Sequence, residues 1–147
     1  MCIRDSITTA ASSRGLAVGD LWNDGKISIV VSNMNAQPSL LVNQIHNANH
    51  WIAIRTVGTK SNRDGIGARV RVKTPSRILV DEVRSGSSYS SNSDMRVHFG
   101  LGSAAKIDWV EIRWPSGLTE RFANLPVDQM HTLKEGSGTI AEADPKK

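Results

Sequence analysis

The chain has 147 residues, enough for one ordinary domain or for one small domain with part of another. Hydrophobic residues make up 39% of it, well above the share in a disordered chain. The net charge of +4 comes from 18 basic and 14 acidic residues that are scattered along the chain, so neither a nucleic-acid-binding patch nor a membrane-binding patch is expected. No apolar run reaches the roughly 18 residues of a membrane span, so membrane insertion is not expected either.

Residues 1–6 fit none of the patterns that follow, and we interpret them as a non-native remnant. This segment contains Cys2, the only cysteine, so an intrachain disulfide cannot hold the fold together. Because the native start is then unknown, the absence of a signal peptide here says nothing about localisation.

Residues 7–45 are predicted to form a compact antiparallel unit of three strands. Apolar residues alternate with a period of two, and no window of 11 or more residues has the 3.6-residue period of a helix. Turns rich in Asn, Asp, Gly and Pro separate the apolar runs. The strands are expected at 15–19, 27–32 and 39–43.

A polar linker at 46–50 marks the predicted boundary, and residues 46–136 are predicted to form a second all-β domain. Short strands with turn signals every 8–15 residues are typical of a small antiparallel β-sandwich or barrel. The seven strands are expected at 51–57, 68–73, 78–84, 96–99, 107–114, 119–122 and 130–133. Residues 137–147 are a polar tail that we expect to be flexible.

The alternation within two of these strands predicts which face is buried. In the strand at 68–73, one face carries Ala68, Val70 and Val72, and the other carries Arg69, Arg71 and Lys73. In the strand at 107–114, Trp109 shares its face with Glu111 and Arg113. Such a tryptophan either covers the aliphatic stems of its charged neighbours or serves as a ligand platform.

The turn after the first strand has the outline of a calcium loop. That motif needs oxygen ligands at positions 1, 3, 5, 7 and 9 and a glycine at position 6. Gly25 stands at position 6, but Trp22 occupies position 3 and cannot ligate. The loss of charge favours a metal-free turn over a degenerate calcium site, and no other cofactor is expected. The candidate calcium ligands are Asp20, Asp24, Lys26 and Ser28.

Two sets of segments carry family resemblances. The first set lies at 15–20, 23–25, 29–33 and 39–43, and it resembles an FG-GAP (VCBS-type) repeat, the blade of a β-propeller. The second set lies at 49–51, 58–72, 83–89, 98–102 and 110–117, and it resembles the ASPIC/UnbV domain of the cartilage acidic protein 1-like family. The resemblance implies a propeller blade followed by a β-sandwich, an extracellular or cell-surface location, and upstream blades of the same full-length chain as partners.

Two loops, at 58–67 and 85–93, are the best candidates for ligand binding if they lie together at one end of the sandwich. Their polar, cationic and aromatic side chains suit the hydroxyls of a glycan or an anionic matrix polymer. The candidate residues are Lys60, Asn62, Arg63, Asp64 and Tyr89. The alternative is that Asn62, Asp64 and the loop glycines only shape the turn.

Nothing in the sequence supports an enzyme. The four histidines have no cysteine or paired carboxylates near them in sequence, and the serine-rich loop at 85–93 lacks a nucleophile elbow. We therefore expect a non-enzymatic extracellular module that binds a carbohydrate or a surface or matrix protein. Two alternatives stay open: a purely structural cap that closes the propeller, with Trp51 packed at the junction, and a part of a secreted enzyme of unknown reaction.

Overall fold

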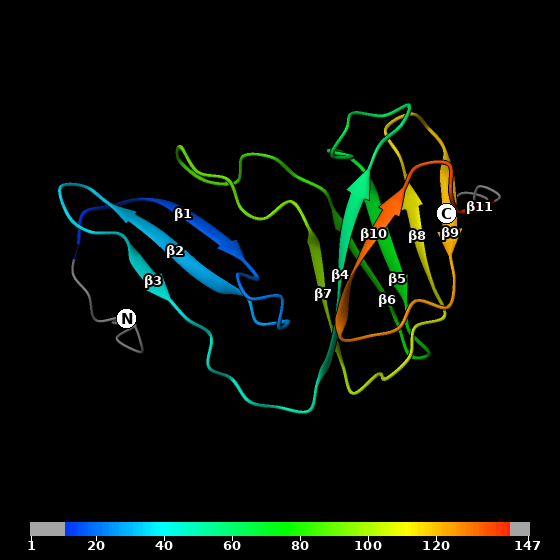
Figure 1. Ribbon diagram of the computed structural model, residues 1–147, viewed down its shortest axis with the longest axis horizontal. Coiled ribbons are helices and arrows are strands. Elements are labelled where there is room, and N and C mark those ends of the chain that lie inside the picture. Colours follow the sequence, from blue (N-terminus) through cyan, green and yellow to red (C-terminus); the bar gives the residue numbers. More distant parts are fainter. Residues whose placement is uncertain (1–10, 142–147) are drawn as a thin grey trace.

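A computed structural model describes residues 11–141, and this part of the chain consists of strands and loops arranged in three sheets (Figure 1). The predicted remnant at 1–6 and the end of the predicted tail, residues 142–147, lie outside the described residues. Within residues 11–141, no helix is long and apolar enough to cross a membrane. The all-β prediction is confirmed.

The first sheet is a three-stranded antiparallel meander, as the sequence predicts. Its order is β1-β2-β3, with β1 at Ser13–Gly19, β2 at Ser28–Asn33 and β3 at Ser39–Leu41. The turns between the strands contain left-handed residues, namely Asn23, Gly25 and Asn35. Asn and Gly adopt this conformation with little strain, which explains why the chain reverses at these points.

The other two sheets pack face to face as a sandwich (Figure 1). One has the order β10-β4-β7, with β4 at His50–Val57, β7 at Val97–Gly102 and β10 at Gln129–Lys134. The other sheet has five strands in the order β11-β9-β8-β5-β6. These strands are β5 at Arg69–Lys73, β6 at Ile78–Glu82, β8 at Trp109–Arg113, β9 at Thr119–Phe122 and β11 at Thr139–Ile140.

Three details differ from the sequence-based expectation. The described residues form no closed barrel, and the sandwich is mixed because β10 pairs with β4 in parallel. The expected flexible tail begins too early, since β11 pairs with β9 inside the segment at 137–147. The backbone N–H of Ala141 also donates to the Thr119 carbonyl at 3.0 Å, which extends this edge of the sheet by one more contact.

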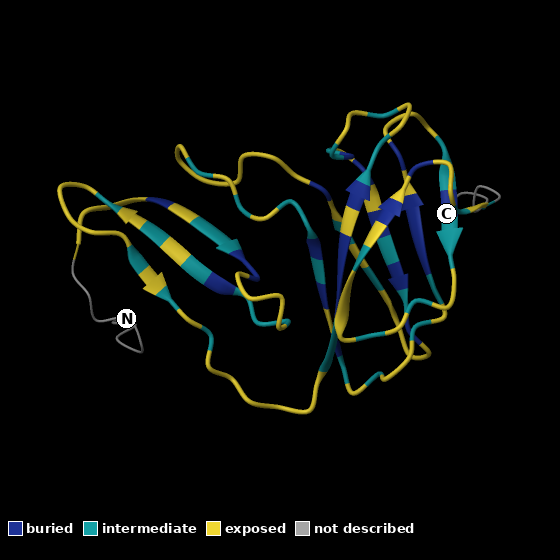
Figure 2. Cartoon of the chain, in the orientation of Figure 1, coloured by how far each residue is buried: buried dark blue, intermediate teal, exposed yellow. Residues whose placement is uncertain are grey.

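The core lies between the two sheets of the sandwich, where Figure 2 shows the dark buried segments. Val70, Val72, Val110 and Ile112 are fully buried, whereas Arg69 is exposed, so the predicted alternation is confirmed. Burial of a Val or Ile side chain contributes about 1.5–3 kcal/mol, and these residues therefore fix the register. The complete set of buried apolar residues is Ile52, Ile54, Ala68, Val70, Val72, Val83, Val97, Phe99, Leu101, Val110, Ile112, Trp114 and Leu133.

A buried carboxylate closes one end of this core. Glu120 is 1% exposed, and it accepts a hydrogen bond from the indole N–H of Trp114 at 2.8 Å. It also accepts from the backbone N–H groups of Gly136 and Gly138, both at 2.9 Å. Because the Trp114 N–H would otherwise be buried without a partner and the two glycine N–H groups lie in the segment after β10, Glu120 ties that segment to the sandwich.

Candidate functional site

The loop at 58–67 is organised around a carboxylate from the far end of the chain. Glu135 is 3% exposed, and its Oε2 atom accepts hydrogen bonds from the backbone N–H groups of Thr59, Lys60 and Ser61 at 2.7–2.8 Å. Its Oε1 atom accepts from the hydroxyls of Ser61 and Ser116. Burial raises the pKa of Glu135, but these hydrogen bonds outweigh it and lower the pKa to about 2.

The predicted ligand residues in this loop divide into turn-forming and exposed side chains. Asn62 uses both ends of its amide within the loop, because Oδ1 accepts from the Ile66 N–H at 2.7 Å and Nδ2 donates to the Ile66 carbonyl at 2.8 Å. Arg63 is 87% exposed and pairs with Asp64 at 3.2 Å. The side chain of Lys60 is on the exposed surface. Asn62 therefore shapes the turn, while Lys60 and Arg63 are accessible.

The loop at 85–93 leaves the sandwich and lies along β1 (Figure 1). The backbone N–H of Leu16 donates to Ser88 Oγ, and that of Val18 donates to Ser93 Oγ, both at 3.2 Å. The Asp94 N–H donates in turn to the Val18 carbonyl at 2.9 Å. The serine side chains thus satisfy the free edge of β1, which the sequence did not predict.

Tyr89 belongs to this second loop and is 70% exposed. Among the described residues, no hydrogen bond or ion pair joins the loop at 85–93 to the loop at 58–67. The five predicted ligand residues are therefore divided between two loops with separate contacts. Arg63 and Tyr89 are both largely exposed.

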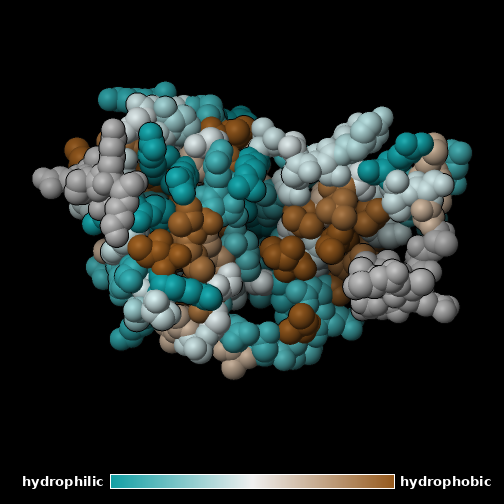
Figure 3. Space-filling view, turned by 180° about the vertical axis from the view of Figure 1, so that it is seen from behind, coloured by the Kyte–Doolittle hydropathy of each residue, from teal (hydrophilic) through white to brown (hydrophobic). Residues whose placement is uncertain are grey.

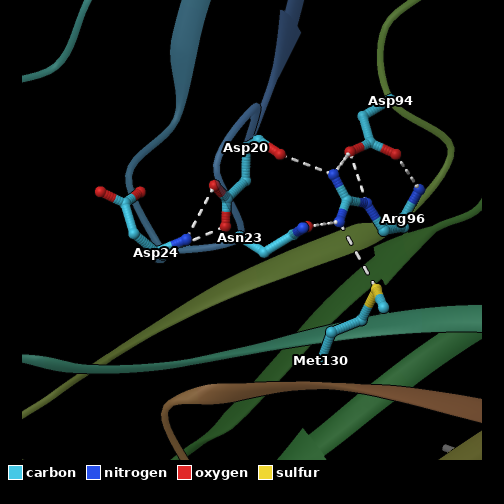
Figure 4. A network of polar contacts seen from close by, with 7 residues as sticks. Asp20, Asn23, Asp24, Asp94, Arg96 and Met130 are labelled. Carbon is cyan, nitrogen blue, oxygen red and sulfur yellow. Dashed lines mark hydrogen bonds and ion pairs between the residues drawn. The ribbon is translucent and has the colours of Figure 1, made fainter.

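Arg96 forms the polar centre of the junction between the first sheet and the sandwich (Figure 4). Its guanidinium donates to the carbonyl of Asp20 at 2.7 Å and to the side-chain oxygen of Asn23. It is held in place by Asp94, whose Oδ2 accepts from Nε at 2.6 Å, and it lies 3.4 Å from the sulfur of Met130. One side chain therefore connects the β1–β2 turn, the segment before β7, and β10.

Aromatic rings form a second part of the junction. The rings of Trp51 and His98 are stacked with 5.5 Å between their centroids. Gly25 packs on the indole so closely that a Cβ atom there would lie 2.3 Å from Trp51 Nε1, and its φ of +82° also favours glycine. Burial lowers the pKa of His98, and nearby Asp20 opposes this effect. The Trp51 ring thus packs against the turn between β1 and β2.

A cavity of about 340 Å³ lies beside these contacts, between β1 and strands β6 and β7. Its lining is rich in charged groups, which include Asp81, Glu82, Arg84 and Arg96. His98 also lines it, and its Nε2 atom is buried with no hydrogen-bond partner among residues 11–141. Arg84 pairs with Asp81 at 3.4 Å, so two of the lining charges already compensate each other.

The structure shows hydrogen bonds for each of the predicted calcium ligands, most of them within the turn. Asp20 Oδ1 accepts from the Asp24 N–H at 3.1 Å, and Oδ2 accepts from the Gly25 N–H at 2.8 Å. Asp24 accepts from the Lys26 N–H at 3.1 Å, which lowers the pKa of Asp24, and it pairs with the Lys26 ammonium at 3.4 Å. Ser28 Oγ accepts from the Asn43 N–H at 3.4 Å. A cation here would have to compete with these donors.

Trp109 is covered by cations. The Cζ atoms of Arg71 and Arg121 lie 5.9 Å and 4.7 Å from its ring centroid. Both arginines also bind Glu111 at 2.8 Å, and Glu111 is 5% exposed. Of the two interpretations of Trp109, the structure favours the one in which the ring packs against its charged neighbours.

Sequence reasoning did not single out Arg96, Glu120 or Glu135. The inward position of Glu120 was detectable, because the alternation in β9 places it on the same face as Phe122. No local pattern marks Glu135, which acts on a loop 74–76 residues earlier in the chain.

Comparison with known proteins adds the family. No curated protein matches the chain. The model of the ASPIC and UnbV family matches residues 58–140, which is more than half of the chain. The match includes the loop at 58–67, Glu135 and most of the sandwich. The matched region begins at the first residue of the loop that the sequence had singled out for the same resemblance. The chain therefore belongs to the ASPIC and UnbV family.

Proposed function

We propose that this chain is the C-terminal part of a larger extracellular β-propeller protein, and that its ASPIC/UnbV sandwich is a non-enzymatic module that caps the last blade, residues 7–45. The observation that carries this proposal is the Arg96 junction, in which one guanidinium binds both the β1–β2 turn and Asp94 of the sandwich (Figure 4). The extracellular location rests on the family resemblance alone.

The surface of the first sheet supports the idea that this unit belongs to a larger assembly. Cross-strand partners in an antiparallel pair point to the same side, so Leu16 and Val31 share one face, while Val30 and Leu40 share the other. Leu16 is 41% exposed and Leu40 is 50% exposed. Figure 3 shows hydrophobic side chains gathered over this sheet. A sheet with two apolar faces needs neighbours on both sides, as stacked β-units provide.

The contacts of the histidines support a non-enzymatic module. His50 Nδ1 binds the carboxylate of Asp128 at 2.6 Å, and Asp128 also accepts from the Trp51 N–H at 3.1 Å. His131 Nε2 binds the Pro126 carbonyl at 2.8 Å. His98 is stacked on Trp51. These three imidazoles support the fold rather than a nucleophile.

The capping proposal is tested by hydrogen exchange on the full chain. Replacement of Arg96 by Ala leaves the Oδ2 atom of Asp94 and the acceptors of the β1–β2 turn without their guanidinium donor, which costs about 2 kcal/mol. We expect the amides of β1 and β2 to exchange about 30-fold faster, while those of β5 and β8 keep their protection. Arg84→Ala is the matched control, because Arg84 is exposed and bound to Asp81. Unchanged protection of β1 and β2 in Arg96→Ala would contradict the proposal.

Recognition of a glycan by the two loops is a second proposal. Its support is the high exposure of Arg63 and Tyr89, neither of whose side chains is used to build the core. Binding of the chain to an array of neutral and acidic glycans, compared with Arg63→Ala and Tyr89→Ala, tests it. Equal binding by all three proteins would eliminate these residues as the site.

A further inference from the structure

The outward face of the five-stranded sheet concentrates positive charge. The side chains on this face alternate with the core residues along β5, β8 and β9. Together with β6, and counted within residues 11–141, they bring together five cations and two carboxylates, although the charges are scattered in the sequence. The cations are Arg69, Arg71, Lys73, Arg113 and Arg121, and the carboxylates are Glu82 and Glu111.

Two of these cations are direct cross-strand neighbours. Arg69 of β5 pairs in register with Arg113 of β8, and both side chains are exposed. Like charges in directly opposite positions destabilise a sheet. Glu82 stands opposite Arg69 on the other side, yet neither arginine has an ion pair or side-chain hydrogen bond within residues 11–141. The pair therefore presents two guanidinium groups whose charges no carboxylate in this part of the chain neutralises.

The centre of the same face is rigid. Arg71 and Arg121 are held against the ring of Trp109 and by the carboxylate of Glu111. Lys73 stands opposite Trp109 in the next strand. Neighbouring strands are about 4.8 Å apart and alternate residues about 7 Å apart, so the cations form a closely spaced grid. Side chains that are ordered before binding lose less entropy when a ligand binds.

We propose that this face binds a sulfated polysaccharide. Arginine binds the oxygens of an oxyanion through two parallel hydrogen bonds, and a polymer with closely spaced sulfates complements a grid of this density. A single-stranded nucleic acid fits less well, because it is held by bases stacked on aromatic rings, and here the Trp109 ring is already covered by guanidinium groups. This surface is separate from the Arg96 junction and does not depend on the capping role.

Titration of the full chain with a heparin oligosaccharide tests the proposal. The double variant Arg69→Gln/Arg113→Gln removes two contacts, each worth up to about 1 kcal/mol, and should bind about tenfold more weakly. The control Lys60→Gln/Arg63→Gln removes the same charge from the loop at 58–67 and should change the affinity less than twofold. Thermal unfolding should show that the first variant is as stable as the wild type, since it relieves a like-charge pair.

Three results would overturn the proposal. Equal weakening in the two double variants would mean that only the net charge attracts the polymer. Undiminished binding by Arg69→Gln/Arg113→Gln would mean that the sheet face is not the site. Equal affinity for the heparin oligosaccharide and for single-stranded DNA of the same charge, or for a sparsely charged carboxylated polysaccharide, would mean that sulfate is not recognised.

Discussion

Neutralising the charge of Glu135 should remove a defined, pH-dependent part of the stability. The folded chain holds the pKa of this carboxyl at about 2, against 4.5 for an unperturbed glutamate. A lowered acid pKa stabilises the folded state above pH 4.5, and this contribution disappears as the pH falls from 4.5 to 2. At about 1.4 kcal/mol per pKa unit, Glu135 contributes about 3 kcal/mol at neutral pH.

The variant Glu135→Gln isolates this contribution because the side chain keeps its shape. Its remaining carbonyl oxygen can still accept from Thr59, Lys60 and Ser61, while the amide nitrogen faces hydroxyls that are able to accept. Urea unfolding at pH 7, 4.5 and 2.5 gives the free energy of unfolding of both proteins. We expect the variant to be about 3 kcal/mol less stable at pH 7 and the two curves to converge near pH 2.

The difference between the two proteins matters more than either curve alone. Effects of pH on the rest of the chain are common to both proteins, so they cancel in the difference. Glu82→Gln is the control, since Glu82 is exposed and has no ion pair in the described part of the chain. A Glu135→Gln difference that stays constant between pH 7 and pH 2.5, or one no larger than that of Glu82→Gln, would refute the reasoning.

Three further predictions concern the first sheet and its junction. Gly25→Ala should destabilise the junction by more than 2 kcal/mol, because the added Cβ atom would meet the Trp51 ring. Gly86→Ala is the control: the φ of Gly86 is also positive, but no atom lies within 4 Å of an added Cβ, so it should cost only about 1 kcal/mol. Thermal unfolding of the wild type and of Asp20→Ala, in calcium and in chelator, tests the degenerate calcium site. If the turn is metal-free, calcium changes the melting temperature of neither protein. A calcium-dependent rise in the wild type alone would establish the site. The lowered pKa of His98 means that the wild type loses stability as the pH falls below about 6.5. The free energy of unfolding of His98→Phe should therefore fall less between pH 7.5 and pH 5 than that of the wild type. Equal losses in the two proteins would contradict this.

Strand faces could be predicted from the sequence, but the order of the strands could not. In β5 a shift of one residue would expose Val70 and Val72, so the alternation specifies which face is buried. The parallel pairing of β10 with β4 depends instead on tertiary contacts, because the two strands are far apart in the sequence. Asp128 helps to fix that pairing, because it accepts a hydrogen bond from the Trp51 N–H, and neither residue has a local pattern that indicates the contact.

The candidate site was predicted less well, because a polar residue in the sequence can face either the solvent or its own backbone. Asn62 has the character of a binding residue, yet both ends of its amide bind Ile66 within the turn. Ser88 and Ser93 have the same character, and they bind the edge of β1. Which polar groups stay available depends on tertiary contacts, and those contacts include Glu135, far away in the chain.

The position of Glu135 also decides where an anionic ligand can bind. The three consecutive backbone N–H groups of Thr59, Lys60 and Ser61 would suit an external anion, but the chain's own carboxylate already occupies them. An anion at this loop would have to displace Glu135 and leave a buried charge without its donors, at a cost of about 3–5 kcal/mol. Arg69 and Arg113 carry no such internal anion in the described part of the chain. A polyanion therefore gains more on the sheet face than in the loop at 58–67.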